Sequence, residues 1–418
     1  MQTNKFYNPK LQILNFSLFL VIYHYYEFSI SLNSYAYKYS IKNRNEFIYI
    51  LFALSPFTFS SLARPFGGII SAWWQRKTDN CIFPTLLLIF SCISIIVNSI
   101  SNLTYIESIA KLIIFLRVLQ GLLIGGIIPH YFIYYYENSS NTLQKIFFCV
   151  GFFVTIYIAV LLSGVVVHLL PLSIQYWFNI VIDFILLLIS GKAYQYRHAW
   201  GKFILGRVLA TKSIPLLATI KTNYGSILRL SMFISFMASI NSFFLTVMPF
   251  YLIHFLYYKA ADVFLLSTIS TAFGIIGFLL SGYYHKTIGK KWHLSIGIIL
   301  KIILFILFRL YVHHDLALTI LFGSLCLFFT GLLLGKTPLI LNSIFPANTR
   351  LHAISITYNL SHGLMFGFSG FIEILLLIHF HNLYIPSLFI LFFSYMSIIS
   401  LWYTPEKDFY RYIDEVKN

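Results

Sequence analysis

Residues Arg117 to Gly126 read RVLQGLLIGG and lie inside an apolar run that begins near Ser108 and continues past Phe132. An apolar run of this length predicts a membrane-spanning helix. Arg117 lies roughly nine residues into the run, which at 1.5 Å per residue is ~13 Å deep, near the bilayer centre. An arginine there costs at least ~2.5 kcal/mol and normally faces a polar cavity or a partner. Because Arg117 is far from both ends of the run, snorkelling to an interface is the weaker alternative.

Three glycines follow the arginine on the same predicted helix: Gly121, Gly125 and Gly126. Small residues remove side chains from one side of a membrane helix, so a neighbouring helix can approach closely. The stretch therefore predicts a buried, permanently charged cation on a closely packed helix.

The composition of the whole chain indicates an α-helical membrane protein. Of its 418 residues, 59% are hydrophobic and only 10% are charged, whereas a soluble domain has about 25% charged residues. A β-barrel would show short alternating segments, and these apolar runs are continuous. The formal charge of +16 falls in short loops between the runs. This is the positive-inside pattern of membrane proteins, so no nucleic-acid partner is expected.

Taken in order, the apolar runs predict twelve spans. They lie roughly at 12–36, 47–73, 82–101, 108–134, 146–169, 175–194, 227–252, 263–284, 292–312, 316–338, 351–378 and 383–403. We expect a basic stretch without a span to divide them into two halves. The predicted parts are a six-helix half at 1–194, a basic cytoplasmic linker at 195–226, a six-helix half at 227–403 and a cytoplasmic tail at 404–418.

The basic residues predict the orientation in the membrane. With the N-terminus inside, the outer loops hold mainly Lys38, Lys42, Arg44 and Lys259, and most other Lys and Arg residues fall in inner segments. Cytoplasmic loops carry the excess of Lys and Arg, so both termini are expected in the cytoplasm. No small-residue cleavage site follows the basic start MQTNKFYNPK, which indicates an uncleaved first span. We expect a multi-pass monomer in the inner (plasma) membrane of a bacterium.

The two halves share a sequence repeat. The stretch Gly67 to Arg76, GGIISAWWQR, aligns without gaps to Gly277 to Lys286, GFLLSGYYHK. Each copy ends the second span of its half and enters a short basic loop. Two related halves are typical of a transporter whose substrate site lies between them near the midplane. Chance similarity of two helix ends is the alternative, and the matching position in each half argues against it.

Several motifs together resemble the metabolite:proton symporter family of the major facilitator superfamily. They are Leu62 to Gly68 (LARPFGG), the RVLQG…GG run, Phe345 to Arg350 (FPANTR) followed by Tyr358-Asn359-Leu360, and Tyr25 to Phe28 (YYEF), which is similar to the family's WYDF. The resemblance covers nearly the whole chain. It implies twelve transmembrane helices in two six-helix halves, and a substrate of the proline/betaine or dicarboxylate class.

The chain departs from the family in the loop after span two, where Asp79 and Asn80 take a glycine and an arginine position, and at four positions where the family has an acid. The superfamily's loop between spans two and three has an acid where this chain has Arg76, and the corresponding position of the second half is Lys286. The family's glutamate before WYDF is replaced by His24, and the glutamate after the double glycine by Ile127. These changes put tight coupling in question, but they leave the fold unaffected.

Glu27 and Arg117 are the predicted proton-coupling pair. Glu27 lies about nine residues from the outer end of its span, so its depth matches that of Arg117. A carboxylate beside a guanidinium keeps its charge, whereas one separated from it in low dielectric takes up a proton. Related sugar–proton symporters look similar in pairing a first-span acid with a fourth-span arginine. The alternative is a static ion pair that only offsets the cost of burial.

The resemblance also implies residues for binding and gating. We expect substrate contacts from Tyr26, Gln120, Tyr358 and Asn359. A zwitterion such as betaine is recognised by an aromatic face for its cation and a donor for its carboxylate. The expected gating residues are Arg64, Glu137, Arg76, Lys286 and Arg350, with Arg64 paired to Glu137.

The remaining interior polar residues are His24, His130, Asp183, Lys301, His362 and Glu373. We expect structural roles for His130 and His362. Lys301 and Glu373 have no matching family motif, and the sequence leaves two alternatives open. They pair with each other or with substrate, or they face different cavities.

No enzyme or cofactor motif occurs in the sequence. There is no P-loop, HExxH or GxSxG, and Cys81, Cys92, Cys149 and Cys326 stand singly, without metal-ligand spacing. The sequence therefore predicts a secondary transporter of a small zwitterionic or anionic metabolite with protons, without cofactor or metal. An uncoupled facilitator is one alternative. The other is a non-transporting sensor or scaffold with a transporter fold, supported by the replaced loop acids.

Overall fold

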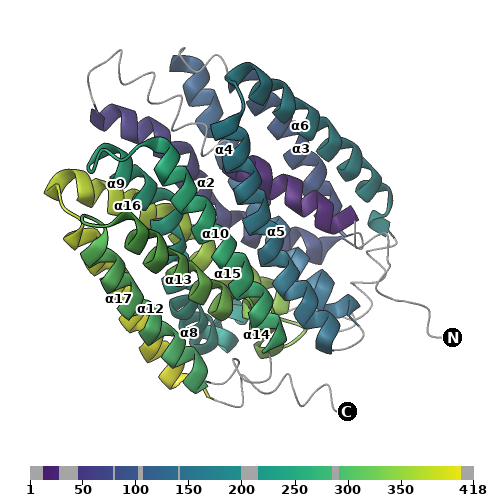
Figure 1. Cartoon of the computed structure of the whole chain (residues 1–418). Helices are drawn as coiled ribbons and strands as arrows, with labels where there is room; N and C mark the ends of the chain where they lie inside the picture. Colours follow the sequence, from purple (N-terminus) through teal and green to yellow (C-terminus); the bar gives the residue numbers. More distant parts are fainter. Residues whose placement is uncertain are drawn as a thin grey trace.

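The computed structural model describes residues 13–27, 46–78, 81–101, 107–139, 142–198, 215–284 and 291–405, and every regular element among them is helical. Figure 1 shows two groups of helices, one coloured purple through blue to teal and the other teal through green to yellow. We call residues 13–198 the N-terminal half and residues 215–405 the C-terminal half. The all-helical class predicted from the sequence is confirmed.

The N-terminal half begins with a helical segment at residues 13–27. Five helices follow: α2 (Glu46–Lys77), α3 (Phe83–Ser101), α4 (Glu107–Asn138), α5 (Thr142–Leu169) and α6 (Leu172–Gln195). Within this half α4 packs against α2 and α3, and α3 also packs against α6.

The C-terminal half contains three interrupted spans and three continuous ones. Its helices are α8 (Leu216–Ser242), η1 (Phe243–Val247), α9 (Met248–His254), α10 (Ala260–Tyr283), α12 (Lys291–Tyr311), α13 (Leu316–Leu334), α14 (Thr337–Ile344), α15 (Arg350–Tyr358), η2 (Asn359–Gly363), α16 (Leu364–Phe380) and α17 (Tyr384–Tyr403). The helix α13 packs against α10 and α12, and α17 packs against α8.

Ten helical stretches of the described chain are long and apolar enough to cross a membrane. The other two predicted spans lie on residues 13–27 and on α2, while the predicted continuation of the first span to residue 36 is outside the described residues. The start of the seventh span was predicted too late, because α8 begins at Leu216 rather than at residue 227. Hydropathy marks only the apolar part of a helix, whereas Pro215 at the N-cap marks its true beginning.

Two spans contain a π-helical turn that the apolar pattern did not predict. The turn η1 ends two residues before Pro249, whose ring nitrogen cannot donate to the preceding turn of the helix. The turn η2 has no proline, and it lies in the span that carries Tyr358 and Asn359. Single π-turns inside α-helices are frequent at functional sites.

Glycines allow corresponding helix pairs in the two halves to touch backbone to backbone. A Cβ atom at Gly67 of α2 would collide with the carbonyl of Leu122 in α4. A Cβ atom at Gly277 of α10 would collide with the carbonyl of Phe328 in α13. Gly67 and Gly277 are the first residues of the aligned repeat, so the repeat corresponds to the same close packing in both halves.

We predict that Gly277→Ala destabilises the protein, because a methyl group there meets backbone that has no room to yield. Overpacking of this kind costs about 1–3 kcal/mol, so the purified variant should melt several degrees below the parent in detergent. The matched control is Gly151→Ala in α5, where an added Cβ would meet nothing within 4 Å. Equal melting temperatures for the parent and both variants would contradict the packing argument.

Candidate transport site

Arg117 lies inside the N-terminal half, where its guanidinium is held by polar side chains. Its Nη1 donates to Gln120 Oε1 at 2.8 Å, and Gln120 Nε2 donates to Ser94 Oγ at 2.9 Å. Only 3% of Arg117 is exposed. Gln120, predicted as a substrate contact, therefore has both ends of its amide engaged inside this half and orients the arginine.

Glu27 is buried near the same guanidinium. The charges of Glu27 and of Asp183, on α6, both act on Arg117. The structure thus brings the two predicted coupling residues together, as their matching depths indicated. It also adds Asp183, a carboxylate that the sequence could not place.

His24 and Asp183 form a contact that the sequence did not predict. His24 Nε2 lies 2.8 Å from Asp183 Oδ1, and Asn98 Nδ2 donates to Asp183 Oδ2 at 2.7 Å. The same amide nitrogen lies 3.4 Å from His24 Nδ1, which is too long to fix the tautomer of the ring. The one available signal was position, since His24 precedes Glu27 by three residues and falls on the same helix face.

Arg64 lies between the halves. A Cβ atom at Gly125 of α4 would stand 2.0 Å from the carbonyl oxygen of Arg64. A Cβ atom at Gly363 of η2 would stand 3.1 Å from Arg64 Nε. Its charge acts on Tyr26, Tyr358 and His362. Arg64 therefore points from α2 toward the π-turn η2 of the other half.

Buried polar atoms without a hydrogen-bond partner gather around this contact. They are Arg64 Nε and Nη2, Asn359 Oδ1 and His362 Nδ1. The hydroxyl of Tyr358, buried among them, interacts with Arg64. Buried polar groups are nearly always paired, so a group of them without protein partners makes this region a candidate binding site. We call these four residues the central polar cluster. His362 belongs to it, although its sequence context gave no reason to expect more than a structural role.

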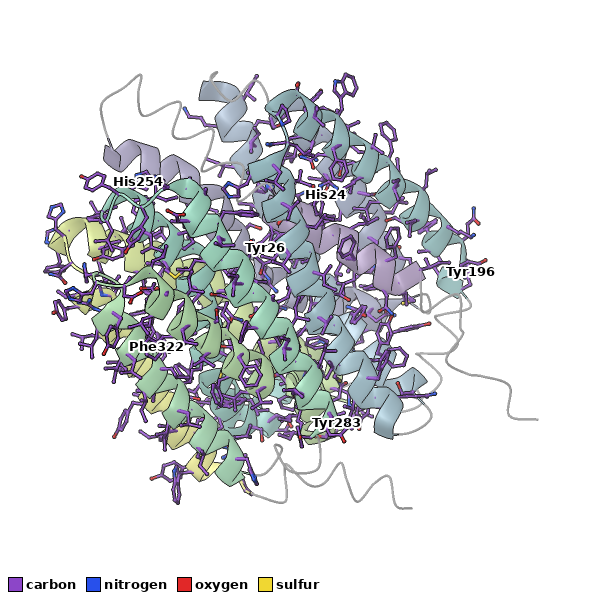
Figure 2. The ribbon with its side chains drawn as sticks, in the orientation of Figure 1. His24, Tyr26, Tyr196, His254, Tyr283 and Phe322 are labelled. Atoms are coloured by element: carbon purple, nitrogen blue, oxygen red, sulfur yellow. The ribbon has the colours of Figure 1, made fainter. Side chains whose placement is uncertain are left out.

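Aromatic rings line the same region. The rings of Tyr358, His362 and Phe366 stack in series, at 5.2 and 5.6 Å between centroids. Tyr26 meets Phe366 edge-on at 5.9 Å, and Figure 2 shows Tyr26 near the centre of the molecule, where the two halves meet. Three of the predicted substrate contacts, Tyr26, Tyr358 and Asn359, therefore lie around Arg64, while Gln120 does not.

Asn359 also ties the halves together directly. Its Nδ2 donates to Gly125 O across the boundary at 2.7 Å and to Ser355 O at 2.9 Å. A Cβ at Gly68 would stand only 2.5 Å from that nitrogen. The double glycine of the LARPFGG stretch thus makes room for the amide of the opposite half.

The ends of α4 and α15 form a second contact between the halves. Arg350 Nη1 donates to Glu137 Oε1 in an ion pair, and Arg350 Nε donates to Phe345 O at 3.1 Å. The expected pairing of Glu137 with Arg64 is wrong. Arg64 lies level with Gly125, and Glu137 is twelve residues, or ~18 Å, further along α4.

Of the two predicted loop residues, the structure describes Arg76. Arg76 is exposed at the end of α2, and its charge acts on His352 of α15 across the boundary between the halves. Lys286 lies outside the described residues. Gating roles for these residues, and for Arg64, Glu137 and Arg350, stay predictions.

Lys301 and Glu373 do not pair with each other. Lys301 Nζ contacts Met237 Sδ at 3.4 Å and faces the ring of Phe236 at 5.1 Å. Neither carboxylate oxygen of Glu373, which is fully buried in α16, has a hydrogen-bond partner. Of the two alternatives, the structure favours separate environments. In the part of the chain that the structure describes, no three His, Cys, Asp or Glu side chains are grouped so that they could hold a metal ion.

The chain is similar in structure to two solved transporters. One is the proton:xylose symporter XylE bound to 6-bromo-6-deoxy-D-glucose, with a TM-score of 0.71, 14% sequence identity, and 98% of this chain and 99% of that chain covered. The other is the human organic anion transporter MFSD10, with a TM-score of 0.64, 11% identity, and 94% and 99% covered. No family model and no curated protein matches the sequence.

Likeness at this level of identity shows the fold. The chain has the fold of the major facilitator superfamily, and the twelve-helix fold class predicted from the sequence is confirmed. The resemblance to proline/betaine transporters stays a prediction.

We predict that the ion pair between Glu137 and Arg350 keeps this end of the boundary closed. Glu137→Gln should expose the nearby α14, whereas exchanging the charges, Glu137→Arg with Arg350→Glu, should close it again. The readout is labelling of Ser343→Cys, a buried α14 position, by a water-soluble thiol reagent. Labelling should rise several-fold in the single variant and fall in the exchanged one. Equal labelling in the parent, the single variant and the exchanged variant would show that the ion pair does not keep this end closed.

Proposed function

We propose that this chain is a secondary active transporter that moves a small zwitterionic or anionic metabolite together with protons, by alternating access. The central polar cluster is the observation that carries the proposal. Its unpaired atoms belong to both halves, as a substrate site near the midplane of a two-half transporter requires.

The composition of the cluster favours an anionic group on the substrate. Arg64 offers two unpaired nitrogens, and a guanidinium binds a carboxylate through two parallel hydrogen bonds. The faces of the aromatic rings of Tyr26, Tyr358 and Phe366 suit a cationic group on the same molecule, through cation–π attraction. A zwitterion with a carboxylate and a substituted ammonium satisfies both ends.

Glu27 and Arg117 support proton coupling. While the carboxylate lies close to the guanidinium, its charge is balanced. Once bound substrate or a rearrangement of helices within the half separates them in a low-dielectric interior, the carboxylate takes up a proton. One structural neighbour is described as a proton:xylose symporter and the other as an organic anion transporter. Their descriptions favour proton coupling and anion transport as the first activities to test.

The uptake test uses purified protein in lipid vesicles and a panel of labelled zwitterions, dicarboxylates and neutral sugars. We predict that zwitterions or dicarboxylates exchange and that neutral sugars do not. Arg64→Gln should abolish this exchange, because no charge remains for the carboxylate. The control is Arg309→Gln, which should keep exchange. The guanidinium carbon of Arg309 lies 3.9 Å from the ring centroid of Tyr384, outside the central polar cluster. Exchange of neutral sugars alone would contradict the substrate class.

The coupling test uses Glu27→Gln, which keeps the shape and a hydrogen bond but cannot carry a proton. We predict that this variant still exchanges substrate without a gradient and loses accumulation driven by a proton gradient. Arg117→Lys keeps the positive charge but loses the planar guanidinium with its paired donors. It should therefore impair both exchange and accumulation.

If Glu27→Gln accumulated as much substrate as the parent, the coupling role of Glu27 would be wrong. Exchange by a parent that never accumulates substrate would favour the uncoupled facilitator. A parent that binds a ligand of the panel but exchanges none would favour the sensor or scaffold, an alternative that the basic residue at Arg76 supports.

A further inference from the structure

Glu373 of α16 is a buried carboxylate that the proposed transport mechanism does not use. Its side chain is fully buried, and neither carboxylate oxygen has a hydrogen bond or an ion pair among the described residues. Lys301, a buried cation of the same half, contacts Met237 and Phe236 instead. Because a charged side chain inside a membrane-spanning segment is costly, one that is kept there marks a candidate functional site.

Two serine hydroxyls without a hydrogen-bond partner belong to the same place. Ser369 precedes Glu373 by one turn of α16, and the glutamate side chain leans back over Ser369 and Gly370. A Cβ atom at Gly370 would stand 2.4 Å from the hydroxyl oxygen of Ser242 in α8. The missing side chain of Gly370 therefore lets Ser242 reach the turn of α16 that Glu373 covers. Both serines are fully buried, and neither hydroxyl has a partner in the described part of the chain.

The π-turn η1, which follows Ser242 directly, frees a backbone oxygen. Met248 N–H donates to Phe243 O, five residues back, and so not to Phe244 O. In the π pattern the next donor, to Phe244 O, is residue 249, and Pro249 has no N–H. Neither the α nor the π pattern therefore supplies a donor to Phe244 O. The turn η1 packs against α16, and carbonyls of interrupted helices coordinate Na⁺ or H⁺ in several transporter folds.

The chemistry of these groups fits a monovalent cation. Carboxylate, hydroxyl and carbonyl oxygens are the ligands that hard cations prefer. The single carboxylate of Glu373 balances one positive charge, and a divalent ion would leave a second charge uncompensated in a buried site. A proton on Glu373 would form one hydrogen bond, whereas a sodium ion contacts several oxygens at once. Sodium therefore accounts for both serine hydroxyls as well as the carboxylate.

We propose that Glu373, Ser242 and Ser369 form a sodium-binding site at the interrupted seventh span. The backbone oxygen of Phe244 is available as a fourth ligand. The proposal goes beyond proton coupling, and it departs from the sequence-based expectation of a protein without metal. Glu373 is seven residues, or ~10 Å, from Phe366 along α16. A bound ion thus joins the seventh span to the helix that carries Phe366 beside the central polar cluster.

The test is binding of radioactive sodium to the purified full-length protein in detergent, without substrate. We predict saturable binding by the parent that choline does not displace, and a higher melting temperature in sodium than in choline. Glu373→Gln should abolish binding, because it removes the negative charge. Ser242→Ala should raise the dissociation constant roughly tenfold or more, as expected for the loss of one polar contact to a charged group.

The matched control is Ser239→Ala, one turn before Ser242 on the same helix. Ser239 is also fully buried, but its hydroxyl already donates to Ser235 O at 2.9 Å. This variant should bind sodium as the parent does. Ser242→Ala decides the matter if Glu373→Gln does not fold.

A parent that binds no sodium would overturn the proposal and indicate a protonated carboxyl at Glu373 instead. Sodium binding that stays the same in Glu373→Gln and Ser242→Ala would also overturn it, because the ion would then lie elsewhere. The measurement needs no transport. Its result is therefore separate from the uptake tests of the proposed function.

Discussion

A guanidinium inside a membrane-spanning bundle has to be balanced where it stands, because neither lipid nor bulk water can solvate it there. Arg117 is balanced by charges from the segment 13–27 and from α6. This requirement draws Glu27 and Asp183 toward one point. Asp183 in turn holds His24 and Asn98. The polar interior of the N-terminal half follows from one positive charge and the carboxylates that it gathers.

The two halves meet through contacts of different character. At the central polar cluster, buried donors and acceptors from both halves have no hydrogen-bond partner within the protein. At the ends of α4 and α15, Glu137 and Arg350 pair with each other. A contact that is satisfied without substrate can hold the molecule closed, whereas an unsatisfied one gains from substrate. This difference is what alternating access about a central site requires.

The sequence predicted features that depend on one helix or on a repeat. The depth of Arg117 follows from a run of apolar residues, and the matched packing of Gly67 and Gly277 follows from an alignment of two segments. Contacts between helices that are distant in the sequence were harder to predict. His24 and Asp183 are on the first and sixth spans, and each alone resembles an isolated polar residue. The predicted pairing of Arg64 with Glu137 was wrong because it matched opposite charges only. It did not compare the level of Arg64 with the position of Glu137 along α4.

The central claim is that the two halves rock about the cluster, so that one end of the boundary opens as the other closes. Helices α5 and α10 run antiparallel across that boundary, with Gly282 near Val150 at one end and Phe264 near Gly164 at the other. Spin labels at Leu169 and Tyr257 report the Phe264 end, and labels at Phe147 and Tyr283 report the Gly282 end. All four side chains are exposed. Distance measurements by electron–electron resonance, with and without substrate and across pH, should show one distance increasing while the other decreases. Two distances that stay fixed, or that change together, would contradict the account.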